Sequence, residues 1–232
     1  MTSLKDWIWN ERQQIGKDYE SIEEVALYDE SHSKFRDLKL ESHEILKLIG
    51  AKPGMKLLDI GCGTGIFSIE ASKKGLDVTA IDVSNTMLEY AKTKANEAEV
   101  SINFEEGGFL THTSPPSHYD LITSSFSFHH LPDFFKFIAL DRLRRLIKSD
   151  GKLFIQDVIV EQNNYEPNVN QFIDRQESVG GNFLREDAIV HFQEEYSTFD
   201  WILEELFRKA GFQIVDSSIQ GGLLGRYLCS LA

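Results

Sequence analysis

The chain contains 232 residues, of which 41% are hydrophobic and 26% are charged, proportions that exclude a disordered or fibrous protein. Its 37 acidic and 24 basic residues leave a net charge of -13, which repels phosphate backbones and anionic membranes, so neither nucleic acid nor a membrane is an expected partner. Cys62 and Cys229 provide neither a disulfide framework nor a metal cluster, and without a signal-peptide pattern or a long apolar run we expect a cytoplasmic protein.

Residues 1–50 are predicted to form a mostly helical cap, because Pro53 and Gly54 punctuate the chain before the first strand. From residue 55 to residue 158, short apolar runs alternate with longer segments of helical period, the pattern of a parallel sheet covered by helices. The expected strands are 56–60, 77–82, 100–105, 119–124 and 151–158, and the expected helices are 65–75, 86–97 and 133–148. Gly75 and Gly151 are placed to end two of these helices.

The segment 160–198 is polar and too long for a simple connection between a strand and a helix, so we expect an insertion on the substrate side. Residues 199–232 add a closing helix and two strands, near 212–219 and 226–231. The sequence therefore predicts one α/β domain over 1–232, with a Rossmann-like, doubly wound, mostly parallel sheet of seven strands, helices on both faces and the helical cap.

A glycine-rich turn follows the first expected strand, in the stretch KLLDIGCGTG that runs from Lys56 to Gly65. Glycine suits this turn because the backbone must bend tightly and approach a ligand that a Cβ atom would block. A dinucleotide-binding turn has a third glycine where this chain has Ile66, and the carboxylate of Asp59 suits an ammonium group better than a pyrophosphate. NAD is therefore not the expected cofactor.

The second strand ends in Asp82, whose carboxylate can accept hydrogen bonds from both hydroxyls of a ribose. The alternative is that Asp82 caps the following helix, but Ser84 or Asn85 is available for that role. The position of Asp82 thus implies a cofactor that contains adenosine.

Three stretches in this order, LLDIGCGTG, AIDVS and YDLITSSFSFHHL, resemble motif I, its acidic follower and the fourth-strand motif of the class I S-adenosylmethionine-dependent methyltransferases. The resemblance covers residues 55–158 and is weaker in the cap and the insertion, which vary with substrate in that family. It implies an enzyme that transfers a methyl group from S-adenosylmethionine to an acceptor and releases S-adenosylhomocysteine.

The resemblance also implies where the cofactor lies, with Asp59 near the methionine amino group, Asp82 on the ribose and Met87 beside the adenine, although Met87 is equally consistent with a helix core position. The expected cofactor-binding residues are Asp59, Gly61, Cys62, Gly63, Thr64, Gly65, Asp82, Val83, Met87, Gly107, Gly108, Phe109, Ser124, Ser125 and Phe126. Gly108 departs from the family pattern, which often has an acid or amide there to read the adenine amino group, so we expect backbone groups of 107–109 to substitute.

His129 and His130 follow the fourth strand, where the reacting methyl group is presented, and are the candidate catalytic residues, or else one of them bonds the backbone in a structural turn. In the insertion, the candidates for contacting the substrate are His191, Glu195 and Tyr196, unless they form a polar lid surface. No metal ion is expected, because the fifth strand ends in a single obvious acid, Asp157, followed by Val158.

A small-molecule acceptor is the preferred substrate, because the acidic charge disfavours nucleic acid and the fourth strand lacks the Asn/Asp-Pro-Pro-aromatic run of enzymes that methylate exocyclic amines. A protein or nucleic-acid acceptor, and a cofactor-binding protein without turnover, are the alternatives left open. An NAD-dependent oxidoreductase is disfavoured by the missing third glycine and by Asp59.

Overall fold

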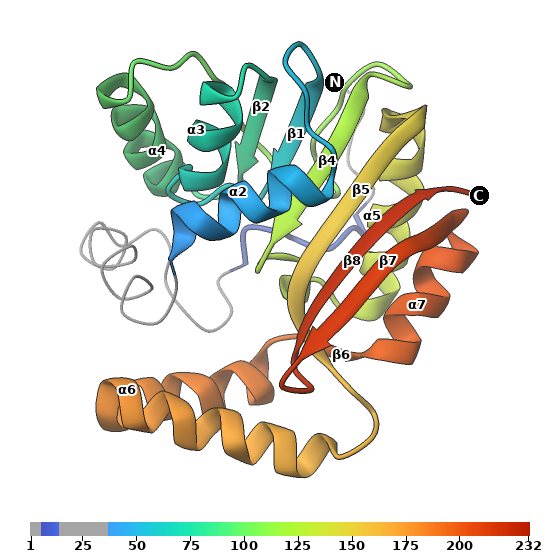
Figure 1. Cartoon of the computed structure of the whole chain (residues 1–232). Helices are drawn as coiled ribbons and strands as arrows, with labels where there is room; N and C mark the ends of the chain where they lie inside the picture. The colour runs from blue at the N-terminus through green and yellow to red at the C-terminus, as the bar shows by residue number, and fades with distance from the viewer. Residues whose placement is uncertain (1–5, 14–36) are drawn as a thin grey trace.

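The protein is built around a twisted central sheet, seen in Figure 1; the computed structural model describes residues 6–13 and 37–232. Seven strands lie in the order β3-β2-β1-β4-β5-β8-β7, and the short β6 pairs with β5. The strands are β1 (Lys56–Ile60), β2 (Asp77–Asp82), β3 (Asn103–Glu106), β4 (Tyr119–Ser125), β5 (Ile147–Val160), β6 (Thr198–Phe199), β7 (Phe212–Gln220) and β8 (Leu224–Leu231). Strands β3, β2, β1, β4 and β5 run parallel to one another. Strand β8 is antiparallel to both of its neighbours, β5 and β7, so the sheet is mostly parallel, as predicted.

Helices cover both faces of this sheet, as Figure 1 shows. They are α2 (Leu38–Leu48), α3 (Ile66–Lys73), α4 (Asn85–Glu97), α5 (Asp133–Leu146), α6 (Tyr165–Glu194) and α7 (Asp200–Lys209), with a short 3₁₀ helix, η1 (Phe128–His130). Helices α2 and α3 contribute to a hydrophobic cluster on one face, and α5 and α7 contribute to the cluster on the other. The doubly wound arrangement is therefore confirmed.

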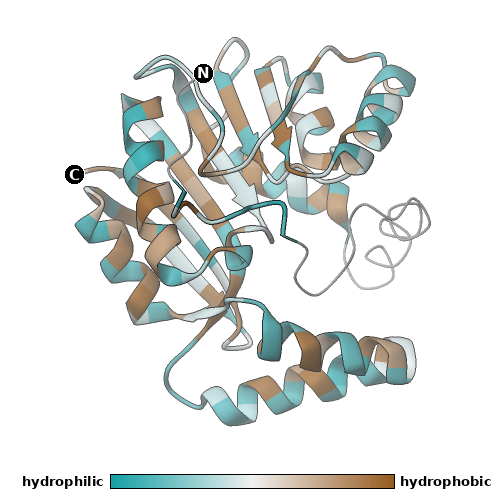
Figure 2. Ribbon diagram, turned by 180° about the vertical axis from the view of Figure 1, so that it is seen from behind, coloured by the Kyte–Doolittle hydropathy of each residue, from teal (hydrophilic) through white to brown (hydrophobic). Residues whose placement is uncertain are grey.

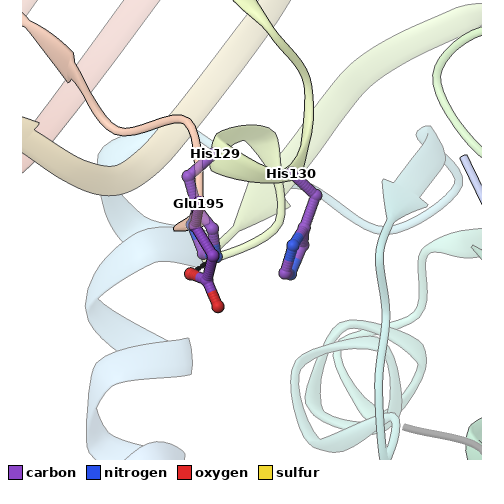
Figure 3. A group of neighbouring side chains, drawn as sticks. All are labelled: His129, His130 and Glu195. Carbon is purple, nitrogen blue, oxygen red and sulfur yellow. Dashed lines mark ion pairs between the residues drawn. The ribbon is translucent and has the colours of Figure 1, made fainter. Parts of the chain in front are cut away.

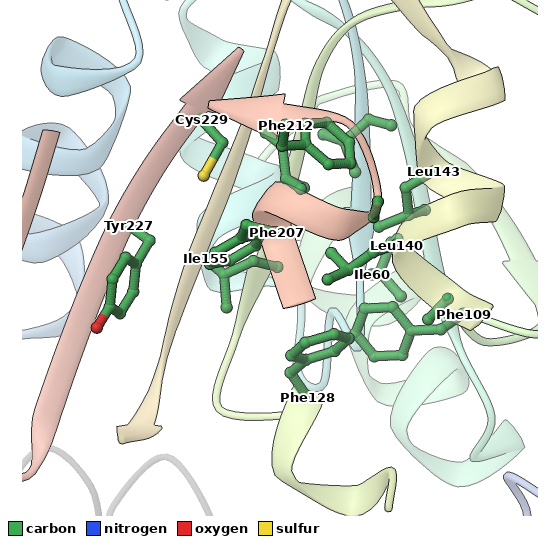
Figure 4. Packing of buried hydrophobic residues seen from close by; sticks show 14 of the residues in the cluster. Ile60, Phe109, Phe128, Leu140, Leu143, Ile155, Phe207, Phe212, Tyr227 and Cys229 are labelled. Atoms are coloured by element: carbon green, nitrogen blue, oxygen red, sulfur yellow. The ribbon is translucent and has the colours of Figure 1, made fainter. Parts of the chain in front are cut away.

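The alternation of side chains along each strand explains why there are two cores. Leu57 and Leu58, neighbours in β1, are both fully buried but belong to different clusters, because successive side chains point to opposite faces of a sheet. Phe154 and Ile155 divide in the same way in β5. Figure 4 shows the cluster that contains Ile155, where Phe207 of α7 packs among the strand residues. Strands buried on both faces read as continuous apolar runs, which is why they were visible in the sequence.

Gly151 does not end a helix, contrary to the sequence prediction. Helix α5 ends at Leu146, and Gly151 lies inside β5, which begins at Ile147 rather than at residue 151. A Cβ atom at Gly151 would lie 2.6 Å from Cγ1 of Ile147 and 2.9 Å from the backbone oxygen of Asp120. Glycine is needed there for close strand packing. Gly75, with φ of 89°, does follow α3 as expected.

The insertion after β5 is mostly one long helical element. Helix α6 is kinked at Gly181, which has φ of 67° and ψ of -158°, and its two segments lie beside each other away from the sheet (Figures 1 and 2). The rings of Phe172 and Phe192 meet across the two segments at a centroid distance of 6.0 Å. Residues 1–5 and 14–36 of the predicted cap lie outside the described residues; of the remainder, α2 is helical and residues 6–13 are not.

Among residues 6–13 and 37–232, no helix combines the length and the apolar character needed to cross a membrane.

Candidate active-site cleft

The glycine-rich turn leaves β1 in a conformation that requires glycine. Gly61, Gly63 and Gly65 have φ angles of 69°, 52° and 79°, in the left-handed region that other residues rarely adopt. A Cβ atom at Gly61 would also collide with the side chain of Ser127 from the segment after β4. The amides of Gly61 and Cys62 donate to the backbone oxygen of Ile81, at 2.9 and 3.0 Å, which ties the turn to the end of β2.

Asp82, the last residue of β2, fixes this turn from the side. Its Oδ2 accepts from the backbone N–H of Gly63 at 2.8 Å, and its Oδ1 accepts from the backbone N–H of Ser84 at 2.9 Å. Ser84 caps α4 by accepting from the backbone N–H of Met87, as the sequence suggested. Asp82 is therefore not the cap of α4, and its carboxylate lies at the edge of an open cleft.

Asp59 lies deeper, below the glycine turn. Ser68 donates to its Oδ2 at 2.5 Å and Thr123 donates to its Oδ1 at 3.1 Å. Burial raises the pKa of Asp59 to about 6, the two hydroxyl donors oppose that rise, and the charge of Asp82 adds to it. A cationic ligand beside this carboxylate would stabilise its charged form.

The cleft opens at the carboxyl ends of β1, β2 and β4, the edge at which ligands bind in open α/β sheets. Its empty volume is about 870 Å³, including its open mouth. The predicted site residues that line it are Gly61, Gly63, Asp82, Val83, Met87, Gly107, Gly108, Phe109, Ser125, Phe126 and His130. Sequence reasoning missed Glu11, Gln13, Ile60, Ser84, Ser127 and Leu131, which also line it.

A second hollow on the other side of the glycine turn is lined by Asp59, Cys62 and Thr64, and it shares Gly61, Gly63, Ser125 and Phe126 with the main cleft. Two of the predicted cofactor residues line neither space. Gly65 is the N-cap residue of α3, and an added Cβ there would lie 2.9 Å from the Cβ of Ala91. Ser124 is buried, and its hydroxyl bonds that of Ser127 at 2.8 Å. Both residues support the cleft from behind.

Glu11, from the N-terminal segment 6–13, reaches the wall of the cleft across about a hundred residues of sequence. Its Oε2 accepts from the backbone N–H of Leu110 and from the hydroxyl of Thr111, both at 3.0 Å. A Cβ atom on Gly108 would lie 2.5 Å from Oε1 of Glu11. Burial raises the pKa of Glu11, and its hydrogen bonds oppose the rise. The carboxylate thus occupies the space of the side chain that Gly108 lacks.

His129 is held between two carboxylates. Its Nδ1 lies 2.5 Å from Oδ1 of Asp157, and its Nε2 lies 3.1 Å from Oε2 of Glu195. Asp157, in the C-terminal part of β5, also accepts from the backbone N–H groups of Phe128 and His129, at 2.7 and 3.1 Å. Burial alone would lower the pKa of His129, but the two carboxylates outweigh it and raise the pKa to about 10.

His130 lines the cleft, whereas His129 is buried behind it. Burial and the neighbouring charge of His129 lower the pKa of His130 to about 4. From the insertion, Nδ1 of His191 pairs with Oε2 of Glu195, and Nε2 of His191 lies 2.8 Å from the hydroxyl of Ser197. The backbone N–H of Tyr196 donates to the carbonyl of His129 at 2.8 Å. The fold therefore gathers the predicted catalytic and substrate residues, although the insertion residues do not line the cleft itself.

Comparisons with known sequences place the chain among methyltransferases. Residues 57–151 match a family described as a methyltransferase domain. The chain is 31% identical over 188 residues to an uncharacterized methyltransferase of Geobacillus kaustophilus (strain HTA426), a match that covers 81% of each protein. It is 27% identical over 224 residues to the demethylmenaquinone methyltransferase of Lactococcus lactis subsp. lactis (strain IL1403), which covers 90% of this chain and 82% of that protein.

Solved structures share the same fold. A SAM-dependent methyltransferase from Aquifex aeolicus superposes with a TM-score of 0.64 at 22% identity, covering 91% of this chain and 99% of that one. The magnesium protoporphyrin IX methyltransferase from Synechocystis PCC 6803, determined with bound SAH, superposes with a TM-score of 0.61 at 18% identity. The match covers 84% of this chain and 83% of that one.

Proposed function

Because the chain belongs to the class I S-adenosylmethionine-dependent methyltransferases, we propose that it transfers a methyl group from S-adenosylmethionine to a small-molecule acceptor. One observation carries the proposal: the glycine turn, Asp82 and His130 all line a single cleft at the carboxyl edge of the parallel strands. The cofactor would occupy the part beside the turn, and the acceptor would enter from the side of His130.

The contacts in the cleft and in the adjoining second hollow give each part of the cofactor a proposed partner. Asp82 would accept from the ribose hydroxyls while it continues to hold Gly63. Asp59 would attract the methionine ammonium group, because its buried carboxylate accepts from two hydroxyls and pairs with no cationic side chain among residues 6–13 and 37–232. Met87 and Phe109 supply apolar surface on which the adenine would pack, at roughly 25 cal/mol per Å² of buried apolar area.

Glu11 would read the adenine amino group, a role that the sequence left to backbone atoms near Gly108. Its carboxylate lines the cleft and lies where a side chain at position 108 would begin. Carboxylate oxygens accept hydrogen bonds from amino groups, and burial in the cleft would strengthen such a bond. Segment 6–13 would thereby close one side of the cofactor site; Trp9 packs edge-on against Tyr196 with ring centroids 5.5 Å apart.

The small-molecule class of acceptor is supported by the acidic charge of the chain and by the demethylmenaquinone methyltransferase among its relatives. We place the substrate side between His130 and the insertion 160–198, within a single domain of the whole chain. Methyl transfer needs an in-line approach at about 3 to 3.5 Å, so positioning by these walls would supply much of the rate. Because His129 is buried behind His130, His130 is the residue that would touch the acceptor.

Calorimetric titration with S-adenosylmethionine, S-adenosylhomocysteine and NAD, in one buffer, tests the cofactor. Binding of the first two at micromolar concentration without binding of NAD is expected, and NAD binding or no binding at all would overturn the proposal. A screen of small molecules for S-adenosylhomocysteine release then tests turnover. Tight cofactor binding, with release only when a protein or nucleic acid is offered, would refute the small-molecule acceptor.

A further inference from the structure

A cluster of histidine and glutamate side chains lies behind the cleft, at the junction of η1 with the end of α6. The rings of His129 and His130 are 4.3 Å apart between centroids, and the ring of His191 is 5.0 Å from that of His129. In Figure 3, the side chains of His129, His130 and Glu195 extend to the same side from two separate segments. One ligand-type atom from each of these three lies within 4.8 Å of the others.

The spacing of His129 and Glu195 fits two ligands of one metal ion. Nε2 of His129 and Oε2 of Glu195 are 3.1 Å apart. Two ligand atoms that are each about 2.0 to 2.2 Å from a metal ion, at an angle near 90° to 110°, are separated by about 3 to 3.5 Å. The ring nitrogen of His130 would approach by rotation of its side chain toward the same point. Imidazole nitrogen together with carboxylate oxygen is a donor set for Zn²⁺ and neighbouring first-row metals.

Asp157 orients His129 in the way that a hydrogen-bond partner orients a histidine bound to a metal ion. A metal-binding histidine almost always donates its other ring N–H to a carboxylate or carbonyl, which fixes the tautomer and makes the ligating nitrogen more basic. Here the 2.5 Å contact between Asp157 and Nδ1 of His129 directs Nε2 toward Glu195. His191 holds the carboxylate of Glu195 in place, since its Nδ1 pairs with Oε2, the oxygen that also faces His129.

The cluster is closed on one side and open on the other. The side chains of His129 and Glu195 are each 7% exposed, whereas His130 lines the cleft. A site with three protein ligands and one open position is the arrangement of catalytic rather than structural zinc centres. We propose that His129, His130 and Glu195 bind a divalent first-row transition-metal ion, with the remaining coordination position facing the cleft. The sequence expectation of no metal ion rests on Asp157 alone, whereas His129, His130 and Glu195 come together only in the folded chain.

The proposal goes beyond methyl transfer and does not depend on it. In the alternative arrangement, a proton alone lies between His129 and Glu195 and the cluster is a buried ion pair. The two arrangements differ in a measurable way, because a metal ion would replace that proton and release it on binding.

Metal binding to the untagged, chelator-treated full chain tests the proposal, with Zn²⁺ followed by calorimetry and Co²⁺ followed by its visible absorption. One ion per chain, with a cobalt spectrum of nitrogen and oxygen ligands, is expected. His130→Ala and Glu195→Gln should each weaken Zn²⁺ binding at least tenfold. Glu194→Gln, an exposed neighbour, and His43→Ala, a largely exposed histidine elsewhere, should leave it within twofold.

Circular dichroism and thermal melting would establish that each variant is folded, and His130→Ala is the more informative substitution because His130 lies at the cleft surface. Absence of micromolar Zn²⁺ and Co²⁺ binding by the wild-type chain would overturn the proposal. So would equal losses in the cluster variants and in the Glu194→Gln and His43→Ala controls. Cofactor binding measured in the same samples separates this outcome from failure of the proposed methyl transfer.

Discussion

Replacement of Asp82 by alanine removes two kinds of contact at once: the backbone hydrogen bonds that the structure shows and the contact that the cofactor would make. The carboxylate accepts from the backbone N–H groups of Gly63 and Ser84, at 2.8 and 2.9 Å, and it lines the cleft where the ribose is proposed to lie. Loss of hydrogen bonds to a charged acceptor costs about 1 to 3 kcal/mol. We therefore expect S-adenosylhomocysteine to bind about 5-fold to about 150-fold more weakly to Asp82→Ala.

The same substitution leaves the backbone N–H of Gly63 without its carboxylate, so the free protein should be less stable as well. For a chain of this size, each kcal/mol lowers the melting temperature by about 2 to 4 °C. Asp77→Ala is a matched control, since Asp77 is an exposed aspartate at the other end of the same strand. It should change neither the affinity by more than twofold nor the melting temperature by more than about 2 °C.

A modified ligand separates the two contributions. Calorimetry with S-adenosylhomocysteine and its 2′-deoxyribose analogue, on wild type and on Asp82→Ala, gives a thermodynamic cycle between the carboxylate and the hydroxyl. If Asp82 accepts from the ribose, the wild type prefers the hydroxylated ligand and the variant loses most of that preference. An equal preference of both proteins for the hydroxylated ligand would refute the ribose assignment. Asp82 would then serve only to hold the glycine turn in place.

Three further predictions concern the cleft and the glycine turn beside it. Glu11→Ala should weaken S-adenosylhomocysteine binding at least about fivefold in calorimetry while a ligand with hypoxanthine in place of adenine loses little, and equal losses for both would contradict the adenine role. Burial raises the pKa of Asp59 from 3.8 to about 6, so its protonated form contributes about 3 kcal/mol to the free energy of unfolding below about pH 4, and this contribution is lost as the pH rises through about 6. Urea melts at a series of pH values should show this fall, and Asp59→Asn should flatten it. Gly61→Ala should lower the melting temperature more than Gly221→Ala, because both glycines have positive φ angles but only the first would gain a clashing Cβ; equal shifts would show that backbone strain alone matters.

The order of the structural elements was predictable because its signals are local. Apolar runs of strand length, segments of helical period and the spacing of Gly61, Gly63 and Asp82 are all properties of a few consecutive residues. In parallel strands the carboxyl ends meet at one edge, so residues that end successive strands come together without further information. This is why most of the predicted cofactor residues do line one cleft.

Local signals failed where a strand and a helix compete for the same residues. Gly151 has the sequence context of a helix end, yet β5 begins at Ile147 because its residues pair with Tyr119 at the start of β4. That pairing joins residues nearly thirty positions apart, and a glycine chosen for close packing looks the same in a sequence as one chosen for a turn.

Sequence alone determined that the chain forms a doubly wound sheet with a glycine turn and an acidic residue at its carboxyl edge, since hydrophobic periodicity and backbone conformation are set by neighbouring residues. Only the tertiary structure brought Glu11 to Gly108, and His129 to Asp157 and Glu195. These contacts join residues separated by about 30 to 100 positions, and their geometry depends on how the N-terminal segment and the insertion pack on the sheet. No local pattern records such packing, so the composition of the cleft wall and of the histidine cluster was decided by the fold.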